Sequence, residues 1–380
     1  MLKIYYICAV DLSNFDAQRT HILEVISEMQ TLGNDVMLLL PRFQSTIENF
    51  PFNICPINVL LKSSKLKFVE YEIRLFFVLL WRCLRNRPDV LFTRKGFLTI
   101  APGIIGKILR IKTVLEVNGI VADEVKSAFG LPDVAVAIFE KIERWNCRIS
   151  DKIIAVTDGL KSMISERFSV DISRIIVISN GVNIRRFHPN GRLTGTGIRL
   201  GFVGNLVNWA GVEILVRSLP LIRQHFQNVE LLIVGDGQER RDLENLVQSQ
   251  NVQSQVTFAG KVAPQEVPDF INQCDICYVP AIAGRNSKIG GSSLKLYEYL
   301  ACGKPVIVSD IPGLDMVRTH QLGRVVPPGD VAALASATID LLRNPDELRT
   351  IATRARAIAE EQFTWTQTTK KILEVCAKKG

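Results

Sequence analysis

A glycine-rich loop followed by a short apolar helix is the part of the sequence whose residue types point most directly to chemistry. The loop is Gly290-Gly-Ser-Ser293, and the predicted helix after it carries Lys295 and Glu298. Glycines let a ligand approach the backbone closely, and the free amides at a helix start suit a diphosphate. Ser293 is placed to cap this helix, and Lys295 adds a positive charge in its first turn, where the helix dipole disfavours one. The pattern predicts a diphosphate site in which Glu298 accepts hydrogen bonds from a ribose diol. It also fits an ordinary loop and helix with a surface Lys–Glu pair.

Cysteine and histidine form no strong catalytic or metal-binding pattern. The eight cysteines are scattered, and Cys274-Asp-Ile-Cys277 has redox-motif spacing without a second such pair to complete a zinc site. This segment is better interpreted as the entry to a strand. Of the four histidines, none belongs to a Ser/His/Asp arrangement, and His21, at the start of a helical pattern, favours a structural or capping role over that of a base. No DxD-type pair stands out, so we expect no metal cofactor.

Short apolar runs alternate with longer helical patterns along the whole chain, which is typical of parallel sheets covered by helices. The predicted strands of the first half are residues 3–9, 35–40, 90–93, 112–117, 152–156 and 174–178. A helix is predicted over residues 20–32, and Gly33 is its expected C-cap.

The second half repeats the same rhythm. Its predicted strands are residues 198–203, 230–234, 256–259, 276–279 and 305–309. Its predicted helices are residues 212–225, 239–249, 264–272, 294–301 and 331–343. A last helix is expected at about residues 365–379.

The length of 380 residues suits two domains of roughly 100–200 residues each. Residues 188–197, HPNGRLTGTG, are polar and glycine-rich and read as a linker. We expect domains over residues 1–187 and 188–364, with residues 365–380 crossing back to the first. Two α/β domains joined in this way enclose a cleft at the carboxyl ends of their strands, where ligands of such folds bind.

The net charge of +8 leaves room for an anionic partner. Basic residues within 62–87 flank or interrupt the apolar run 76–81, FFVLLW. Such a helix suits peripheral contact with an anionic membrane, but the simpler interpretation, which we favour, is a core helix with solvated ends. No apolar run reaches the ~18–20 residues that span a bilayer, and the N-terminus reads as a buried strand rather than a signal peptide. Together with the scattered cysteines, these features favour a cytoplasmic protein. If residues 62–87 contact a membrane, the protein is expected to be peripheral on its inner face.

The second half of the sequence resembles the family 4 glycosyltransferases. Residues 290–312, GGSSLKLYEYLACGKPVIVSDIP, are similar to the family signature, particularly to its S-P-L-K-L-[FY]-E-Y subgroup. Residues 178–189, ISNGVNIRRFHP, resemble I-P-N-G-V-D-x-x-x-F-x-P. Further matching pieces follow in the family's order, namely 200–204 (LGFVG), 209–212 (WAGV), 232–237 (LIVGDG) and 256–260 (VTFAG).

In the first half the resemblance is looser. Residues 115–119, LEVNG, followed by Glu124, resemble the family's L-E-V-N-[GA] element. Because this element follows a predicted strand, we expect its polar groups to face the cleft. Residues 11–21 replace the glycine-rich first loop of many members, and Arg19 and His21 begin the next helix.

The resemblance implies a GT-B fold, with two Rossmann-like parallel-sheet domains facing a central cleft. The second domain would bind a nucleotide sugar and the first an acceptor, and transfer would retain the anomeric configuration without a metal. Electrostatic stabilisation of the leaving diphosphate is then the main catalytic requirement. The expected catalytic residues are Glu298, Lys295 and Asn118. Donor binding is assigned to Gly204, Asn205, Gly235, Asp236, Gly237, Arg285, Lys288, Gly290, Gly291, Ser292, Ser293, Leu294 and Glu298. The acceptor side is assigned to Arg19, His21, Glu116, Asn118 and Gly119.

The sequence departs from the family pattern at several functional positions. The first glutamate of the family's E-x7-E motif is Gly290 here, and the backbone amides of Gly291 and Ser292 are its expected replacement. The arginine and lysine that grip the diphosphate in many members are Asn205 and Ala210. Lys295, with Arg285 or Lys288, is expected to supply that charge. Asn118 occupies the place of a frequent histidine.

These features predict a retaining hexosyl- or related glycosyltransferase, of the general class EC 2.4. Its acceptor is expected to be a glycan or a lipid-linked molecule, as in polysaccharide or glycoconjugate biosynthesis. The departures also fit a nucleotide-sugar-binding protein with lost or weak transfer. A Rossmann dehydrogenase is disfavoured because residues 234–237, VGDG, lack a full GxGxxG, and charge alone gives no nucleic-acid-binding motif.

Overall fold

The computed structural model of the chain describes residues 1–10, 12, 17–43, 50–61, 66–96, 98–123, 132–191 and 197–378, with Ala135 and Arg285 described by their backbone alone. Its contacts divide the chain into two compact units. Unit 1 consists of Met1–Ser179 and Trp365–Gly380, and unit 2 is Asn180–Thr364. The division falls after Ser179 rather than after residue 187, because residues 180–187 pack on unit 2. There Val182 N donates to Phe363 O (2.7 Å), and the Arg356 guanidinium donates to Phe187 O (2.8 Å).

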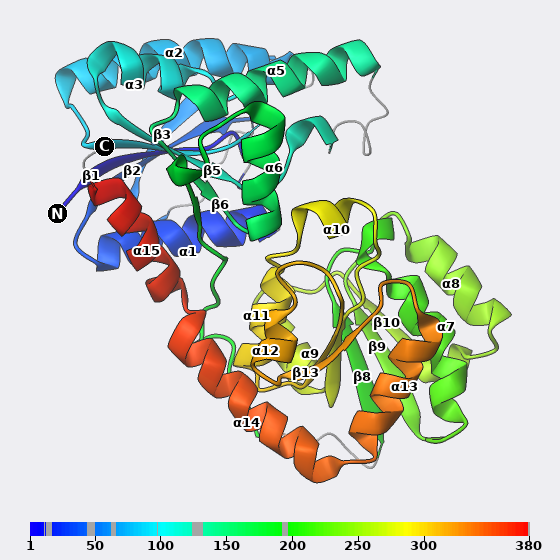
Figure 1. Ribbon diagram of the computed structural model, residues 1–380. Helices are drawn as coiled ribbons and strands as arrows, with labels where there is room; N and C mark the ends of the chain where they lie inside the picture. The colour runs from blue at the N-terminus through cyan, green and yellow to red at the C-terminus, as the bar shows by residue number, and fades with distance from the viewer. Residues whose placement is uncertain are drawn as a thin grey trace. The chain divides into compact units, whose positions relative to one another are not determined.

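Unit 1 contains a parallel sheet of seven strands in the order β3-β2-β1-β4-β5-β6-β7 (Figure 1). The strands are β1 Lys3–Ile7, β2 Asp35–Arg42, β3 Asn53–Asn58, β4 Val90–Arg94, β5 Lys112–Val117, β6 Lys152–Ala155 and β7 Ile175–Val177. The central strands β1, β4 and β5 are almost wholly buried, as their continuous apolar runs predict. The edge strand β3 was not predicted, since Pro56 and its alternating polar residues conceal it.

Helices cover both faces of this sheet. On one face lie α2 Lys67–Arg85, α3 Ala101–Leu109 and α5 Asp133–Ile149, and on the other lie α1 Ala17–Thr31 and α15 Trp365–Ala377 (Figure 1). Helix α6 Asp158–Phe168 packs on α5 and leads to β7 through the 3-10 turn η1 Ile172–Arg174. Helix α1 ends before Gly33, which has φ of +81° and donates to Gln30 O, so the predicted C-cap is confirmed.

Unit 2 contains a parallel sheet of six strands in the order β10-β9-β8-β11-β12-β13. The strands are β8 Ile198–Val203, β9 Val229–Val234, β10 Val256–Gly260, β11 Ile276–Val279, β12 Val306–Ser309 and β13 Gly323–Val326. Its helices and 3-10 turns are η2 Asn208–Ala210, α7 Val212–Arg223, α8 Arg240–Ser249, η3 Gln253–Gln255, α9 Val267–Asn272, α10 Arg285–Ile289, α11 Leu294–Ala301, α12 Met316–Thr319, α13 Val331–Leu342 and α14 Pro345–Gln362. The predicted α/β class with two parallel sheets is confirmed.

Two apolar clusters fill unit 2. One joins α7, α8 and α13 to the sheet, and the other joins α11, α14 and residues Val182 and Phe187 to it. Strand β13 and helix α10 were not predicted, because each is at most five residues long and neither has a long apolar run. The predicted bounds of β8, β11 and α11 agree with those observed.

Candidate functional site

Two tight turns follow β8 and β9 in unit 2 and lie side by side. Gly204 N donates to Val234 O (2.9 Å), and Leu206 N donates to Asp236 O (2.9 Å). Gly235 has φ of +128°, and a Cβ atom there would overlap Gly204 O. Only glycine at position 235 allows the two turns to approach this closely. The predicted donor residues Gly204, Asn205, Asp236 and Gly237 are thus brought together at the carboxyl end of the sheet, with Asn205 and Asp236 exposed.

The loop before α11 explains why position 290 is glycine. Gly290 has φ of 74° and ψ of −175°, a conformation that is essentially restricted to glycine. A Cβ atom at Gly290 would lie 2.6 Å from Pro312 O, which is closer than real contacts allow. The glutamate of the resembling family cannot occupy this backbone as it stands. Gly291 N donates to Pro312 O (2.9 Å), so the expectation that this amide replaces the glutamate is wrong.

Hydrogen bonds from both ends of α11 hold it against β8 and the start of unit 2. Asn180 Nδ2 donates to Ser292 O (2.7 Å), and Val203 N donates to the Tyr299 hydroxyl (2.8 Å). Ser293 occupies the N-cap position, but its side chain makes no capping hydrogen bond, which corrects the expected cap. The helix start is therefore fixed by these tertiary contacts.

Lys295 reaches from the first turn of α11 back to the turn after β8. Its Nζ lies 4.1 Å from the centroid of the Phe202 ring, and a Cβ atom on Gly204 would lie 2.5 Å from it. Burial lowers the pKa of Lys295 to about 8, although Glu298 acts in the opposite sense. The ammonium group is thus a partly buried cation between Gly204 and α11, in the place where the sequence predicted a diphosphate.

The remaining predicted donor residues lie on α10 and α11. Lys288, on α10, is exposed, and Leu294 and Glu298 are partly buried. Arg285 begins α10, and its side chain lies outside the described part of the chain. Asn286 Nδ2 donates to Trp209 O (3.1 Å), so α10 is attached to the segment that contains Ala210.

In unit 1 the predicted acceptor-side residues meet in a buried ion cluster. Glu116 Oε1, on β5, lies 2.7 Å from His21 Nε2 of α1 and 2.9 Å from Arg94 Nη1 of β4. Asn118 Nδ2 also donates to it (3.1 Å). Burial acts to raise the pKa of Glu116, but His21, Arg94 and Asn118 outweigh it and lower that pKa to about 2. Glu116 is only 1% exposed, so the expectation that its carboxylate is open to a ligand is wrong.

The neighbouring residues have mainly structural contacts. His21 is buried and its ring stands edge-on to Trp365, at 5.1 Å between centroids, which supports the structural role over that of a base. Arg19 is buried and donates to Leu12 O (2.5 Å). Asn118 is partly buried and Gly119 is buried. Among the predicted acceptor-side residues, all of which the structure describes, Asn118 is the one that is partly exposed to solvent. Glu124 lies outside the described residues.

The residues that hold the Asn118–Gly119 loop were not predicted from the sequence. Lys95 donates to Gly119 O (3.2 Å) and forms a buried ion pair with Glu143 of α5. Glu143 in turn accepts from Val121 N (2.8 Å) and Ala122 N (2.9 Å). The available signal was a pair of cations at the end of a buried strand, Arg94 and Lys95, because buried cations require partners. No pattern marked Glu143.

Metal and thiol chemistry find no further support among the described residues. No three His, Cys, Asp or Glu side chains in the described ranges come together as a metal site. Cys274 and Cys277 are buried free thiols beside Gly201, and burial raises the pKa of Cys277 well above its usual value. The interpretation of this segment as the entry to a strand, β11, agrees with the structure.

Two family models match the chain in succession. The model described as Glycosyltransferase Family 4 matches residues 18–186, and the one described as Glycosyl transferases group 1 matches residues 197–344. Both models describe glycosyltransferases, and the one that matches the first half of the chain describes those of family 4. Among its relatives, the phosphatidyl-myo-inositol mannosyltransferase of Mycobacterium leprae is 32% identical over 64% of this chain and 63% of the relative. Glycogen synthase of Mycobacterium tuberculosis is 28% identical over 63% of this chain and 57% of the relative. The chain thus spans about 60% of the length of these curated relatives.

Solved structures show the same fold. The sucrose-phosphate synthase of Thermosynechococcus elongatus superposes with a TM-score of 0.80 at 20% identity, covering 98% of both chains. Anabaena HepE, solved in complex with UDP and glucose, has a TM-score of 0.78 at 16% identity, covering 100% of both chains. At these identities the likeness establishes the fold, and the fold is GT-B.

Proposed function

We propose that this chain transfers a sugar from a nucleotide-diphosphate sugar to a glycan or lipid-linked acceptor, with retention, in polysaccharide or glycoconjugate biosynthesis. The observation that carries the proposal is the position of Lys295. Its partly buried ammonium group lies against Gly204, beside the glycine loop that opens α11. A cation in a partly dehydrated site stabilises a leaving diphosphate more strongly than an exposed one does.

We infer that the positive charge of the donor site comes from α11. The family positions that usually carry arginine and lysine are Asn205 and Ala210, so neither contributes charge. Lys295 reaches the same turn from α11, and the proposal assigns Glu298, three residues later, to the ribose. This substitution supports a working site and makes Lys295 the residue on which the proposal depends.

The donor is best identified by thermal stability, since a ligand that binds only the folded protein raises its melting temperature. UDP-sugars are the first probes, because HepE was solved with UDP, and GDP- and ADP-sugars follow. We expect one nucleotide class to raise the melting temperature of the chain and that of Arg349→Ala, whose side chain on α14 is 79% exposed. Lys295→Ala is expected to lose most of this shift. An equal shift in both variants would contradict the assignment of Lys295.

Transfer is then measured with the identified donor and lipid-linked acceptors, which the mannosyltransferase relative suggests as a class. We expect product whose anomeric configuration, read by nuclear magnetic resonance, is that of the donor. Excess EDTA is expected to leave the rate unchanged, since the proposal assigns the diphosphate charge to Lys295. Donor binding without transfer or donor hydrolysis would show instead a binding protein that has lost turnover.

A further inference from the structure

Helix α2 is apolar on two opposite sides. Tyr71, Leu75, Leu79 and Cys83 recur every four residues and are buried against the sheet. Val69, Ile73, Phe77 and Trp81 recur at the same spacing on the outer side. Ile73 is 56% exposed, Phe77 65% and Trp81 55%. A core helix accounts for the buried row that contains Tyr71 and Leu75. It does not account for the outer row that contains Phe77 and Trp81, which no other element of the described structure covers.

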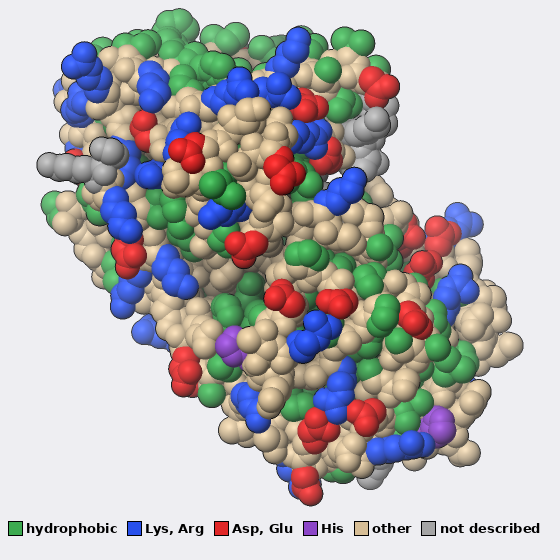
Figure 2. All heavy atoms as spheres, in the orientation of Figure 1, with side chains coloured by type: hydrophobic (Ala, Val, Ile, Leu, Met, Phe, Trp, Pro, Cys, Tyr) green, Lys and Arg blue, Asp and Glu red, His purple; other side chains and the backbone are tan. Residues whose placement is uncertain are grey.

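The outer row continues onto neighbouring helices. Helix α3, which packs on α2, presents Ile108 at 62% exposure, and α5, which packs on α3, presents Val134 and Ile138 at 75% and 54%. Figure 2 shows hydrophobic side chains gathered along the upper edge of unit 1, over α2, α3 and α5. Exposed apolar surface of this extent marks an interaction site.

Basic side chains accompany this surface on all three helices. The guanidinium groups of Arg82 and Arg85 lie 5.7 and 5.5 Å from the ring centroid of Trp81. Lys107 is exposed next to Ile108, and Lys141 is exposed one turn after Ile138. Of the two acidic residues of α2, Glu70 accepts from Leu60 N and Leu61 N, and Glu72 from Ile100 N, so both are occupied by the backbone. The four cations of α2, namely Lys67, Arg74, Arg82 and Arg85, also outnumber these two carboxylates, so the net charge of this helix is positive.

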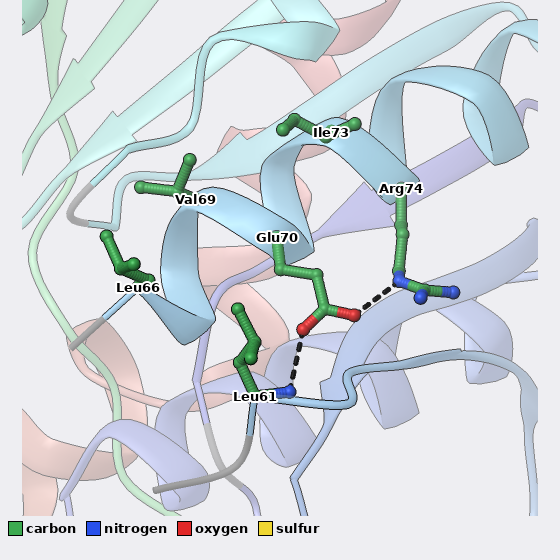
Figure 3. A pocket seen from close by; sticks show the side chains of 6 residues that line it. All are labelled: Leu61, Leu66, Val69, Glu70, Ile73 and Arg74. Atoms are coloured by element: carbon green, nitrogen blue, oxygen red, sulfur yellow. Dashed lines mark hydrogen bonds and ion pairs between the residues drawn. The ribbon is translucent and has the colours of Figure 1, made fainter. Parts of the chain in front are cut away.

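A shallow cavity of about 410 Å³ lies beside the first turns of α2, at one end of this surface (Figure 3). Its lining is aliphatic, with Val69 and Ile73 from α2 and Leu61 and Leu66 from the chain before that helix. The Glu70–Arg74 ion pair (2.7 Å) lies at its polar side. None of the predicted donor or acceptor residues lines it, so the cavity belongs to the apolar surface of α2.

We propose that the outer faces of α2, α3 and α5 form a docking surface for an anionic lipid bilayer, with Phe77 and Trp81 inserted at the level of the headgroups. A helix that lies in a membrane interface combines an apolar face with flanking Lys and Arg, whose stems follow the apolar surface while their charges reach the lipid phosphates. Among the described residues no helix is long and apolar enough to cross a membrane. The docking surface includes the part of residues 62–87 that lies on α2 and continues onto α3 and α5, and Lys62 and Lys65 lie outside the described residues.

The experiment is sedimentation of the full chain with sucrose-loaded vesicles, without donor or acceptor, so its result is independent of the proposed reaction. Phosphatidylcholine vesicles are compared with vesicles containing about 30% phosphatidylglycerol. We expect binding to the anionic vesicles, weakened by salt. Phe77→Ser/Trp81→Ser is expected to reduce the partition constant about tenfold or more. Arg85→Gln/Lys141→Gln is expected to reduce it about fivefold for each charge removed.

Two control variants remove side chains of the same kind, one exposed apolar and one exposed cationic, from positions outside the proposed docking surface. Ile172→Ser removes an exposed apolar side chain of unit 1 on η1 (52% exposed), and Arg349→Gln removes an exposed cation of unit 2. Both are expected to bind as the unchanged chain does, and circular dichroism confirms that every variant is folded. The proposal is overturned by equal binding to neutral vesicles, or by full binding of the double serine variant. It is also overturned if the chain is a dimer that Phe77→Ser/Trp81→Ser separates, since the surface is then an interface between two copies.

Discussion

The pKa of Lys295 is lower than that of an ordinary lysine, and we therefore expect donor binding to depend on pH. Burial lowers its pKa to about 8, so the ammonium form is complete well below pH 8 and is lost above it. We predict that the affinity for the nucleotide diphosphate falls as the pH rises from 7 to 9. Lys295→Arg keeps its charge throughout this range and should give a flat profile. Calorimetric titration at several pH values measures the affinity of the unchanged chain and of Lys295→Arg for the nucleotide diphosphate. A parallel decline in the two proteins would mean that another group titrates.

The pKa of Glu116 is lowered as well, but for a carboxyl group a lower pKa favours the charged form. Its pKa in the folded protein, about 2, lies below the ordinary value of 4.5, so its charge stabilises the fold above pH 4.5 and this stability is lost as the pH falls toward 2. We predict that Glu116→Gln lowers the free energy of unfolding by about 3 kcal/mol at pH 7, because Arg94 is left buried without its carboxylate. Urea unfolding measures this loss, and the difference should shrink in acid.

The matched control is Glu230→Gln. Glu230 pairs with Arg199 at 3.0 Å, but its side chain is 53% exposed, and such surface pairs contribute about 0–1 kcal/mol. If both variants lose similar stability, burial is not what makes the Glu116 cluster important.

At the scale of elements, the loop between α10 and α11 decides which residues the donor site can contain. We predict that Gly290→Glu, which restores the usual residue of the family, does not raise transfer and destabilises unit 2 by about 1–3 kcal/mol. The reason is that φ of 74° and the contact with Pro312 O exclude a side chain. Gly291→Ala is the control, because a Cβ atom there meets only Leu314, at 3.7 Å or more. Thermal unfolding and turnover are measured on both, and a stable, more active Gly290→Glu protein would refute this account.

The elements themselves were predictable where the local pattern was strong. The bounds of α11 followed from a glycine-serine start, an apolar stripe and a glycine stop, all within one short segment. The edge strand β3 was missed because Pro56 and its polar neighbours give no apolar run. Of the partners of Glu116, His21 and Asn118 were assigned with it to the acceptor side, and Arg94 was missed for a different reason. His21, Arg94 and Glu116 lie on α1, β4 and β5, and only the order of strands in the sheet brings them together.

At the scale of the whole molecule, the last helix belongs to unit 1 although it follows unit 2 in the sequence. Trp365, Ile372 and Cys376 of α15 are buried, and Lys112 Nζ donates to Val375 O (2.6 Å). We predict that deleting residues 365–380 lowers the melting temperature of unit 1 and leaves that of unit 2 nearly unchanged. Limited proteolysis with mass spectrometry assigns the cleavage sites to each unit. Deleting residues 379–380 alone is the control, and preferential cleavage of unit 2 after the longer deletion would contradict the prediction.

Unit 2 is an insertion within unit 1 as far as the covalent chain is concerned. The chain leaves unit 1 after Ser179 and returns to it at Trp365, and the two junctions lie next to each other, because Val182 pairs with Thr364 in a parallel bridge. Residues 180–364 can therefore be exchanged as one cassette with a single pair of adjoining splice points. A chimera that carries the corresponding segment of a relative would test whether the choice of nucleotide sugar travels with the cassette, while the lipid-facing helices and both chain ends stay with the host.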